Sequence, residues 1–254
     1  MSHPYFDNGG HPVALAHRGF SLDGLENSMT AFQNAVDLGY RYLETDAHGT
    51  SDGVAVALHD ETLDRTTDAT GLVAERTWDS VKVARIGGIE PVPKLEDVLS
   101  AWPDVKVNID VKGMSGVGPV AEAIERTKSH DRVCVGSFDA ARRRATLRLL
   151  SKPVARSASQ REAIAWWIGS FVGGSAEATI GDVDALQIPW RRGNVPLLYP
   201  KHVRLAHEAG KEVHVWTVNE RSAMVRLLAM GVNGIVTDRA DILKDLLIER
   251  GQWA

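Results

Sequence analysis

Residues 13–47, VALAHRGFSLDGLENSMTAFQNAVDLGYRYLETDA, contain two short apolar runs on either side of an amphipathic one. The runs 13–19 (VALAHRG) and 41–47 (RYLETDA) predict strands, and both end in charged side chains. Between them, 26–39 predicts a helix that starts at a polar cap and stops at Gly39. A strand, a helix and a second strand in this order form the repeating unit of a parallel sheet.

The same alternation continues to the end of the chain. Further strands are predicted at 105–112, 132–138, 154–159, 184–190, 212–218 and 234–238. Helices are predicted at 94–101, 118–129, 139–150, 160–172, 200–209, 220–230 and 240–250. Eight strand–helix units in 254 residues predict a (β/α)8 TIM barrel. A doubly wound sheet is less consistent with the sequence, because no G-x-G-x-x-G follows the first strand.

One stretch does not fit the alternation. Residues 53–60 resemble an added strand, and 61–93 are rich in loop residues, so we expect a small insertion at about 53–93, after the second strand. No linker of low complexity divides the chain. We therefore expect one catalytic domain, residues 1–254.

Composition narrows the possible partners and location. The net charge of −4 offers no basic field for nucleic acid. The single cysteine, Cys134, excludes a disulfide within the chain and fits a reducing compartment. The N-terminal residues do not resemble a signal peptide, and no apolar run is long enough to span a bilayer. These features predict a cytoplasmic protein.

Polar side chains gather where predicted strands end. They are His17 and Arg18 on the first strand, Glu44 and Asp46 on the second, Asp110 and Lys112 on the third, and His59 on the added arm. Glu44 and Asp46 are two residues apart, so both point to one side of their strand. In a barrel, the carboxyl ends of the strands form the active site. We expect all seven side chains in one pocket.

The types of side chain indicate the chemistry. Glu44, Asp46 and Asp110 would repel one another unless a cation lay between them, and oxygen ligands favour Ca²⁺ or Mg²⁺. Arg18 and Lys112 are suited to phosphate oxygens. With three carboxylates, these two cations and a divalent ion, one positive charge remains, which a phosphodiester anion would balance. Two imidazoles can supply the acid and the base of hydrolysis.

These residues carry a resemblance to a known family. H-R-G (17–19), E-N (26–27), E-x-D (44–46), T-x-D-G (50–53), H-D-x-T-L-D-R-T-T (59–67) and N-I-D-V-K (108–112) occur in the order found in glycerophosphodiester phosphodiesterases. The ending HVWTVN…GVNGIVTDRAD, from residue 214, is also similar. The resemblance spans about residues 12–245, with few motif positions between 139 and 210.

The resemblance implies a barrel enzyme that hydrolyses glycerophosphodiesters to an alcohol and sn-glycerol 3-phosphate. It implies that Glu44 and Asp46 bind one divalent metal ion, Ca²⁺ or Mg²⁺, and that His17 and His59 are the acid–base pair. Arg18 and Lys112 would contact the phosphate. The family commonly has Glu as its third ligand, whereas this chain has Asp110, whose shorter side chain favours a bridging water.

Other residues near the strand ends are open to simpler interpretations. Trp216 is expected to line a glycerol pocket. Asn27 or Ser28 can cap the first helix, with Asn27 favoured; Asp238 is expected to cap the last helix, and His48 to line the wall of the pocket. His214 is expected to be buried deeper in the barrel.

The apolar segment AWWIGSFVGG, residues 165–174, leaves a second function open. Barrel packing or a homodimer interface explains it most simply, whereas contact with a lipid tail would favour a lysophospholipase D or a sphingomyelinase-type enzyme. A metal amidohydrolase would have H-x-H at the first strand, where this chain has His17-Arg18. A phosphate-binding protein without catalysis would have no need of both histidines.

Overall fold

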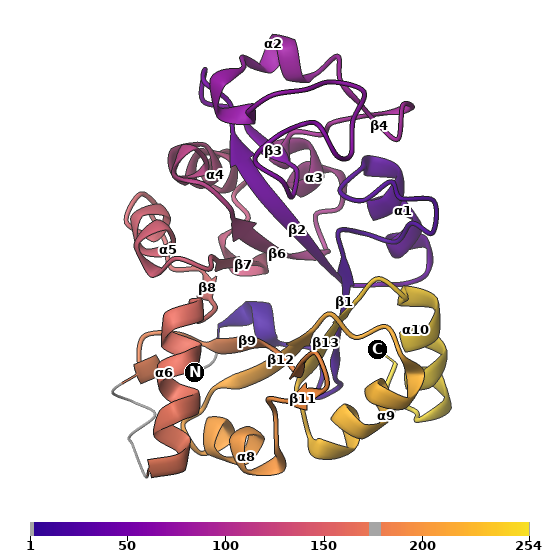
Figure 1. Ribbon diagram of the computed structural model, residues 1–254, viewed down its shortest axis with the longest axis vertical. Coiled ribbons are helices and arrows are strands. Elements are labelled where there is room, and N and C mark those ends of the chain that lie inside the picture. Colours follow the sequence, from indigo (N-terminus) through magenta and orange to yellow (C-terminus); the bar gives the residue numbers. More distant parts are fainter. Residues whose placement is uncertain (1–2, 173–178, 254) are drawn as a thin grey trace.

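The computed structural model describes residues 3–172 and 179–253 (Figure 1). In this part of the chain, eight parallel strands follow one another around a barrel, and the last pairs with the first. They are β1 (Val13–His17), β2 (Tyr42–Gly49), β6 (Lys106–Val111), β7 (Val133–Gly136), β8 (Ala155–Arg156), β9 (Ala185–Pro189), β12 (Glu212–Trp216) and β13 (Gly234–Thr237). The predicted TIM barrel is confirmed.

The barrel is weakest between β8 and β9. β8 has only two residues, and a single bridge between Ser157 and Ala185 joins the two strands. The amide of Ala158 donates to the Ala185 carbonyl at 2.9 Å, and the amide of Asp184 donates to the Arg156 carbonyl at the same distance. The sheet is therefore closed with very few hydrogen bonds at this point.

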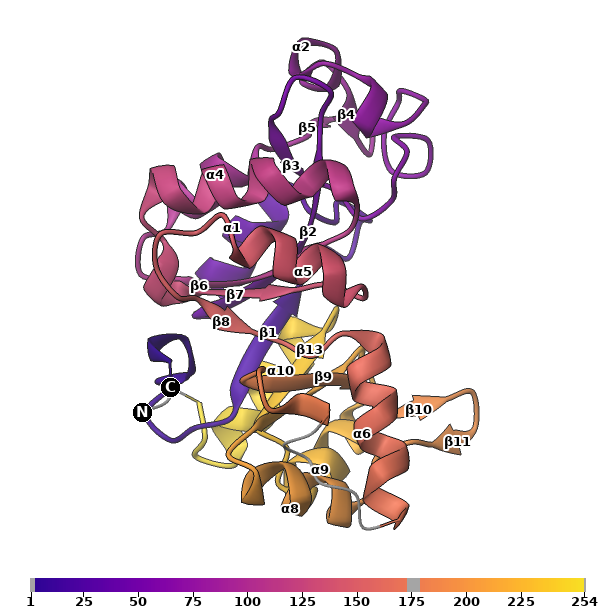
Figure 2. The same cartoon turned by 90° about the vertical axis from the view of Figure 1, so that its left-hand side faces the viewer.

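Each barrel strand is followed by a helix that covers its outer face (Figures 1 and 2). These helices are α1 (Met29–Asp37), α3 (Leu95–Ala101), α4 (Val117–Thr127), α5 (Ala140–Leu147), α6 (Gln160–Val172), α8 (Pro200–Glu208), α9 (Arg221–Met230) and α10 (Ala240–Glu249). Alternate residues of β6 explain the packing. Val107, Ile109 and Val111 belong to the apolar layer under the helices, while Asn108 and Asp110 point into the barrel.

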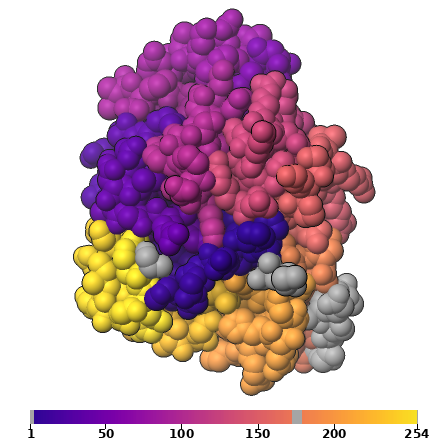
Figure 3. Space-filling view, turned by 180° about the vertical axis from the view of Figure 1, so that it is seen from behind, coloured from indigo at the N-terminus to yellow at the C-terminus, as the bar shows by residue number. Residues whose placement is uncertain are grey.

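The amino-terminal end of the barrel is filled by a short turn. The 3-10 helix η1 (Pro4–Phe6) places Tyr5 and Phe6 in an apolar cluster with residues of the barrel interior, including Leu15 and Cys134. Figure 3 shows this N-terminal segment lying across the rear face of the molecule. Cys134 is buried in the core. The open end of the barrel is consequently the opposite one.

The insertion stands at the top of Figure 1. β3 (Ala55–Ala57) pairs antiparallel with the end of β2, and it is followed by η2 (Val73–Glu75), α2 (Trp78–Val81) and the hairpin of β4 (Arg85–Ile86) and β5 (Glu90–Pro91). These elements enclose an apolar cluster of their own, which includes Leu58, Leu63 and Ile86. The chain leaves β3 through His59, which places this residue beside the barrel mouth.

The turn after β1 differs from the prediction. The strand ends at His17, because Arg18 has a φ of 55° and Gly19 a φ of 84°. A Cβ atom on Gly19 would lie 2.6 Å from the backbone carbon of Ala31, so only glycine fits there. Helix α1 starts later than predicted, at Met29, and its cap is Ser28 rather than Asn27.

The hairpin of β10 (Arg191–Arg192) and β11 (Val195–Pro196) follows β9 and is not predicted from the sequence. It projects from the same side of the barrel as α6 (Figure 2). Within residues 3–172 and 179–253, no helix combines the length and the apolar character needed to cross a bilayer. Of the segment 165–174, residues 173 and 174 lie outside the described residues.

Candidate active site

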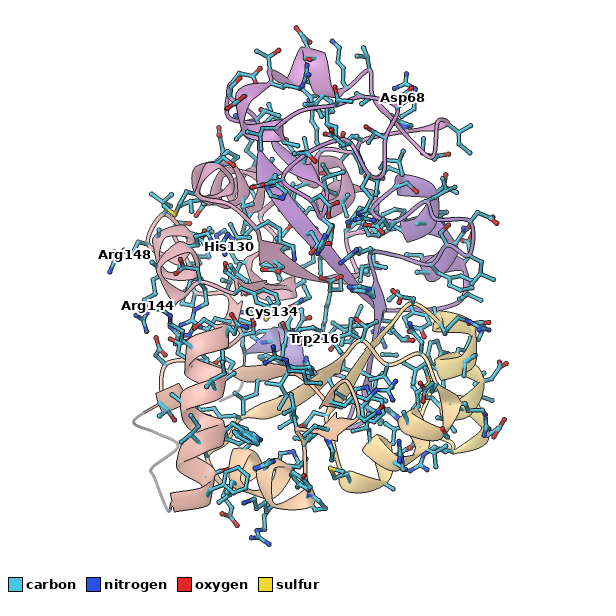
Figure 4. The ribbon with its side chains drawn as sticks, in the orientation of Figure 1. Asp68, His130, Cys134, Arg144, Arg148 and Trp216 are labelled. Carbon is cyan, nitrogen blue, oxygen red and sulfur yellow. The ribbon has the colours of Figure 1, made fainter. Side chains whose placement is uncertain are left out.

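A cavity of about 660 Å³ opens at the carboxyl ends of the barrel strands. All eight predicted site residues line it, namely His17, Arg18, Glu44, Asp46, His59, Asp110, Lys112 and Trp216. Figure 4 marks Trp216 among the side chains in the middle of this face. Five segments far apart in the chain therefore converge, which the prediction of a barrel requires.

His17 is held between two carboxylates. Its Nδ1 atom lies 2.6 Å from Oδ1 of Asp238, and its Nε2 atom lies 3.8 Å from Oε2 of Glu44. Burial alone would lower the pKa of His17, but the Glu44 carboxylate and the hydrogen bond with Asp238 raise this pKa above its usual value. The Nε2 atom is thus directed towards Glu44 while Asp238 fixes the ring.

Asp238 has a different role from the one predicted. The N-cap of α10 is Arg239, and the carboxylate of Asp238 instead contacts His17 and accepts a hydrogen bond from Asn219 Nδ2 at 2.7 Å. The expectation that it caps the helix is wrong. Its position at the end of a barrel strand was visible in the sequence, but its partner lies on the first strand, 221 residues away.

Cations alternate with the carboxylates of the second and third barrel strands. Lys112 Nζ lies 2.9 Å from Asp46 Oδ1 and 2.8 Å from Asp110 Oδ2, and Arg18 Nε lies 2.9 Å from Asp46 Oδ2. Burial raises the pKa of Asp46, but Lys112 and Arg18 outweigh it and hold this pKa below its usual value. Asp46 is therefore ionised at neutral pH.

Glu44 has a contrasting environment. It accepts a hydrogen bond from the backbone amide of Arg18 at 3.1 Å and is almost fully buried. Burial and the neighbouring charge of Asp46 raise the pKa of Glu44 to about 7. Two carboxylates that lie two residues apart on one strand thus differ in their readiness to ionise, because Lys112 and Arg18 lie 2.9 Å from Asp46, whereas His17 Nε2 lies 3.8 Å from Glu44.

His59 belongs to a chain of ion pairs that the sequence did not reveal. Its Nδ1 atom lies 2.5 Å from Oδ1 of Asp60, and Asp60 Oδ2 lies 2.5 Å from Arg65 Nε. Arg65 also binds Glu26 at 2.7 Å, and Glu26 accepts from Arg18 NH1 at 2.9 Å. The H-D-x-T-L-D-R motif contained these partners, but only the fold brings Arg65 to Glu26.

Two further predictions change on the buried side of the site. His48 does not line the cavity; it is buried, and its Nε2 atom lies 3.1 Å from the backbone oxygen of His59. Asn27 binds the second strand, with Nδ2 donating to Asp46 Oδ2 at 3.2 Å and Oδ1 accepting from Thr45 Oγ1 at 2.8 Å. Its left-handed backbone, with a φ of 60°, allows both contacts.

The fit of a divalent cation can be judged from the carboxylates. Asp110 Oδ1 is buried and has no hydrogen-bond partner, and the oxygen donors of the site are those that Ca²⁺ and Mg²⁺ prefer. As the side chains stand, however, no three His, Cys, Asp or Glu residues in the described ranges converge as metal binding requires. Lys112 lies between Asp46 and Asp110. The oxygen donors therefore suit Ca²⁺ or Mg²⁺, and binding of the ion requires Lys112 to move from its position between Asp46 and Asp110.

The rest of the cavity is apolar. Trp216 packs edge-to-face on Phe138, with ring centroids 5.8 Å apart. The wall continues onto α6 through Ile164, Trp167 and Ile168. The cavity thus has a charged half at β1, β2 and β6 and an apolar half at α6 and β12.

TIM-barrel enzymes have their active sites at the carboxyl ends of the barrel strands, and the acidic, basic and imidazole side chains lie there in this protein. The fold and the site therefore indicate a TIM-barrel enzyme. The sequence profile of the glycerophosphoryl diester phosphodiesterase family matches residues 17–242. The chain belongs to this family and is therefore a phosphoric diester hydrolase. Membership of the family, which the sequence motifs indicated, is confirmed.

Relatives and solved structures agree with this assignment. The chain is 48% identical over 247 residues to a probable glycerophosphodiester phosphodiesterase 2 of Mycobacterium tuberculosis, covering 96% of this chain and 94% of the relative. It is 28% identical to a glycerophosphodiester phosphodiesterase of Caldanaerobacter subterraneus, covering 94% and 99%. An Oleispira antarctica phosphodiesterase, solved with the product sn-glycerol-3-phosphate, has the same fold, with a TM-score of 0.79, 20% identity, and 94% and 98% of the two chains covered.

Proposed function

We propose that the enzyme hydrolyses glycerophosphodiesters to an alcohol and sn-glycerol 3-phosphate, with His17 and His59 as the acid–base pair. The observation that carries this proposal is the pairing of each imidazole with an aspartate, Asp238 or Asp60, at one cavity that also holds Arg18 and Lys112. A carboxylate on Nδ1 fixes the ring and leaves Nε2 for proton transfer. The names of the relatives support the substrate class.

In this proposal, Arg18 and Lys112 bind the phosphate. Lys112 and Arg18 both contact Asp46, and both side chains line the cavity. The guanidinium of Arg18 presents several N–H donors, and the ammonium of Lys112 adds a point charge. A phosphodiester anion between them would exchange part of their contact with Asp46 for contact with its own oxygens. Trp216 would then lie against the glycerol or the alcohol.

The acid–base assignment predicts a specific loss of activity. Replacing His17 or His59 with Ala should reduce kcat by about 10²–10⁴-fold, because proton transfer in the transition state loses its donor or acceptor. The measurement is release of sn-glycerol 3-phosphate from glycerophosphocholine at pH 7. Turnover equal to that of the unmodified enzyme would remove the replaced histidine from the mechanism.

We also propose that Glu44, Asp46 and Asp110 hold one Ca²⁺ or Mg²⁺ ion. The oxygen donors and the unpartnered Asp110 Oδ1 support it. Such an ion would offset negative charge on the phosphate oxygens during hydrolysis. A panel of glycerophosphodiesters, assayed after chelation and again after each metal is restored, tests both substrate and ion. Full activity in the chelated enzyme would refute the metal proposal, whereas failure on every diester would refute the substrate class.

The apolar half of the cavity favours a second substrate type. Phe138, Ile164, Trp167 and Ile168 offer a wall for a long acyl or alkyl chain. A mouse lysophospholipase D is 25% identical to this chain over 274 residues, which is a distant relationship. A lysophospholipid with a higher kcat/KM than glycerophosphocholine would make this lysophospholipase D activity the main one. The opposite ranking would leave small diesters as the preferred substrates.

A further inference from the structure

Helix α6 carries an exposed apolar stripe on the rim of the cavity. Ile164, Ile168 and Phe171 are spaced by four and three residues, so they lie on one face of the helix. Their exposed fractions are 50%, 54% and 51%. Figure 2 shows α6 on the same side of the barrel as the projecting β10–β11 hairpin. Because Ile164 and Ile168 also line the cavity, the exposed stripe begins at its mouth.

The barrel does not need this stripe to hold α6 in place. Trp166 is buried in the core, and Glu162 forms an ion pair with the buried Arg143 at 2.8 Å. Trp167 Nε1 donates to the backbone oxygen of Leu197 at 2.7 Å, which joins α6 to the chain after the hairpin. The helix is thus fixed by its other faces. About half of each stripe side chain stays exposed to water, although Phe171 also packs against the rings of Trp167 and His202.

Cationic side chains surround the stripe. Arg161 precedes Ile164 by three residues on the same helical face, and Lys201 Nζ lies 3.4 Å from the ring centroid of Phe171. Arg192, on the hairpin, lines the same cavity as Ile164 and Ile168. Within the described residues, none of these three cations has a carboxylate within ion-pair distance. The chain as a whole has a net charge of −4, so this positive rim is a local feature.

We propose that this docking rim, formed by Arg161, Ile164, Ile168, Phe171, Arg192 and Lys201, binds the surface of an anionic phospholipid bilayer. An amphipathic helix with large apolar side chains flanked by Lys and Arg inserts that face into the lipid interface and attracts anionic headgroups. The proposal goes beyond the proposed function and does not depend on it.

A bilayer suits this surface better than a second copy of the chain. A two-fold interface would place the same patch on both sides and bring Arg161 and Lys201 of the two copies close together. Like charges brought together without carboxylates oppose such pairing. Anionic headgroups, in contrast, complement all three cations. Docking would also turn the cavity mouth towards the lipid, because Ile164, Ile168 and Arg192 line the cavity and the rim together.

Vesicle flotation tests the proposal directly. The full-length enzyme is mixed with vesicles of phosphatidylcholine, with or without phosphatidylglycerol, at low and high salt. We expect binding to the anionic vesicles that weakens with salt. The double variant I164S/I168S should bind at least about tenfold more weakly, since it loses apolar area from the interface. Each of R161Q and R192Q should weaken binding by about fivefold.

A matched control separates docking from general surface hydrophobicity. Leu149 and Ile248 are exposed to a similar extent, 56% and 52%, but lie away from the rim, so L149S/I248S should bind as the unmodified enzyme does. Circular dichroism should give the same Tm for both double variants. Failure of the unmodified enzyme to bind anionic vesicles, or equal binding by I164S/I168S, would overturn the proposal. So would sedimentation showing a dimer that I164S/I168S dissociates.

Discussion

At the scale of single residues, the two imidazoles of the cavity are oriented by the same kind of contact from different parts of the fold. Asp238, at the end of the last barrel strand, holds His17, and Asp60, inside the insertion, holds His59. In both cases the carboxylate contacts Nδ1. In the proposed mechanism, Nε2 of each ring would exchange a proton with the substrate in the cavity.

Replacing Asp238 with Asn should lower the pKa of His17. The imidazolium form would lose the charge and the charge-assisted hydrogen bond that help to raise this pKa. The limb of the pH–rate profile that reports His17 should move to lower pH, and kcat should fall by roughly 10–100-fold. Histidine titration by NMR checks the pKa independently of turnover. An unchanged His17 pKa in the variant would contradict the role given to Asp238.

The raised pKa of Glu44 predicts how stability depends on pH without added metal. The folded protein keeps Glu44 protonated up to about pH 7, whereas the unfolded chain releases this proton near the usual value of 4.5. The stabilisation is complete below pH 4.5 and is lost as the pH rises through about 7. The free energy of unfolding should lose roughly 3 kcal/mol from this group across that range.

The variant Glu44→Gln isolates this effect. It cannot ionise, so the difference between its free energy of unfolding and that of the unmodified protein should grow between pH 5 and pH 8 in denaturant titrations. Saturating Ca²⁺ or Mg²⁺ should restore stability at pH 8 to the unmodified protein only. A pH-independent difference between the two proteins would contradict the pKa assigned to Glu44.

The sequence predicted which residues enter the site better than it predicted the contacts that these residues make there. The eight site residues all line the cavity, because strand parity and strand ends can be inferred from the sequence. The contacts of Asp238, His48 and Asn27 could not be inferred, because each depends on the relative placement of two elements. The pairing of Lys112 with both Asp46 and Asp110 could not be inferred for the same reason.

At the scale of elements, the insertion contributes charged side chains that form ion pairs with the barrel. Arg65 joins Asp60 of the insertion to Glu26 of the β1–α1 loop, and Glu26 in turn contacts Arg18. His59 and Arg18 are therefore connected through ion pairs. The insertion is placed relative to the barrel partly by these charges.

Replacing Arg65 with Ala should lower kcat by about tenfold or more while changing KM and Tm little. The ion pairs of this half-exposed arginine contribute little to stability, but they hold Asp60 and thus the ring of His59. Lysine should restore only part of kcat, because it cannot bridge both carboxylates with a fork. Lys82→Ala, which removes an exposed ion pair with Asp79 in the same insertion, is the control. Equal kcat values for the Arg65 and Lys82 variants would contradict the positioning role.

Element boundaries were predictable where periodicity was strong and failed where a turn decided them. The helices after the third and the last two barrel strands lie within a few residues of prediction. The strand predicted at 154–159 shrinks to two residues, and beyond them only the single bridge of Ser157 to Ala185 continues the pairing. The hairpin after β9 has too few residues to give a strand pattern.

At the scale of the whole molecule, the barrel explains why distant segments form one site. The carboxyl ends of all barrel strands lie at the same end of the barrel. The fold, rather than the neighbouring residues in the chain, therefore determines where a residue at a strand end lies. The repeated alternation of strand and helix patterns in the sequence made the TIM barrel predictable. The apolar half of the cavity was only partly foreseen, because the orientation of α6 across the mouth depends on its packing against the chain near Leu197.

The most direct measurement of where the diester is cleaved is a crystal structure of the enzyme with sn-glycerol 3-phosphate. The phosphate should lie within hydrogen-bond distance of Arg18 and Lys112, with His17 and His59 on either side and the glycerol against Trp216. Phosphate bound elsewhere on the molecule, with Arg18 and Lys112 still paired only with Asp46 and Asp110, would contradict the assignment of this cavity as the active site.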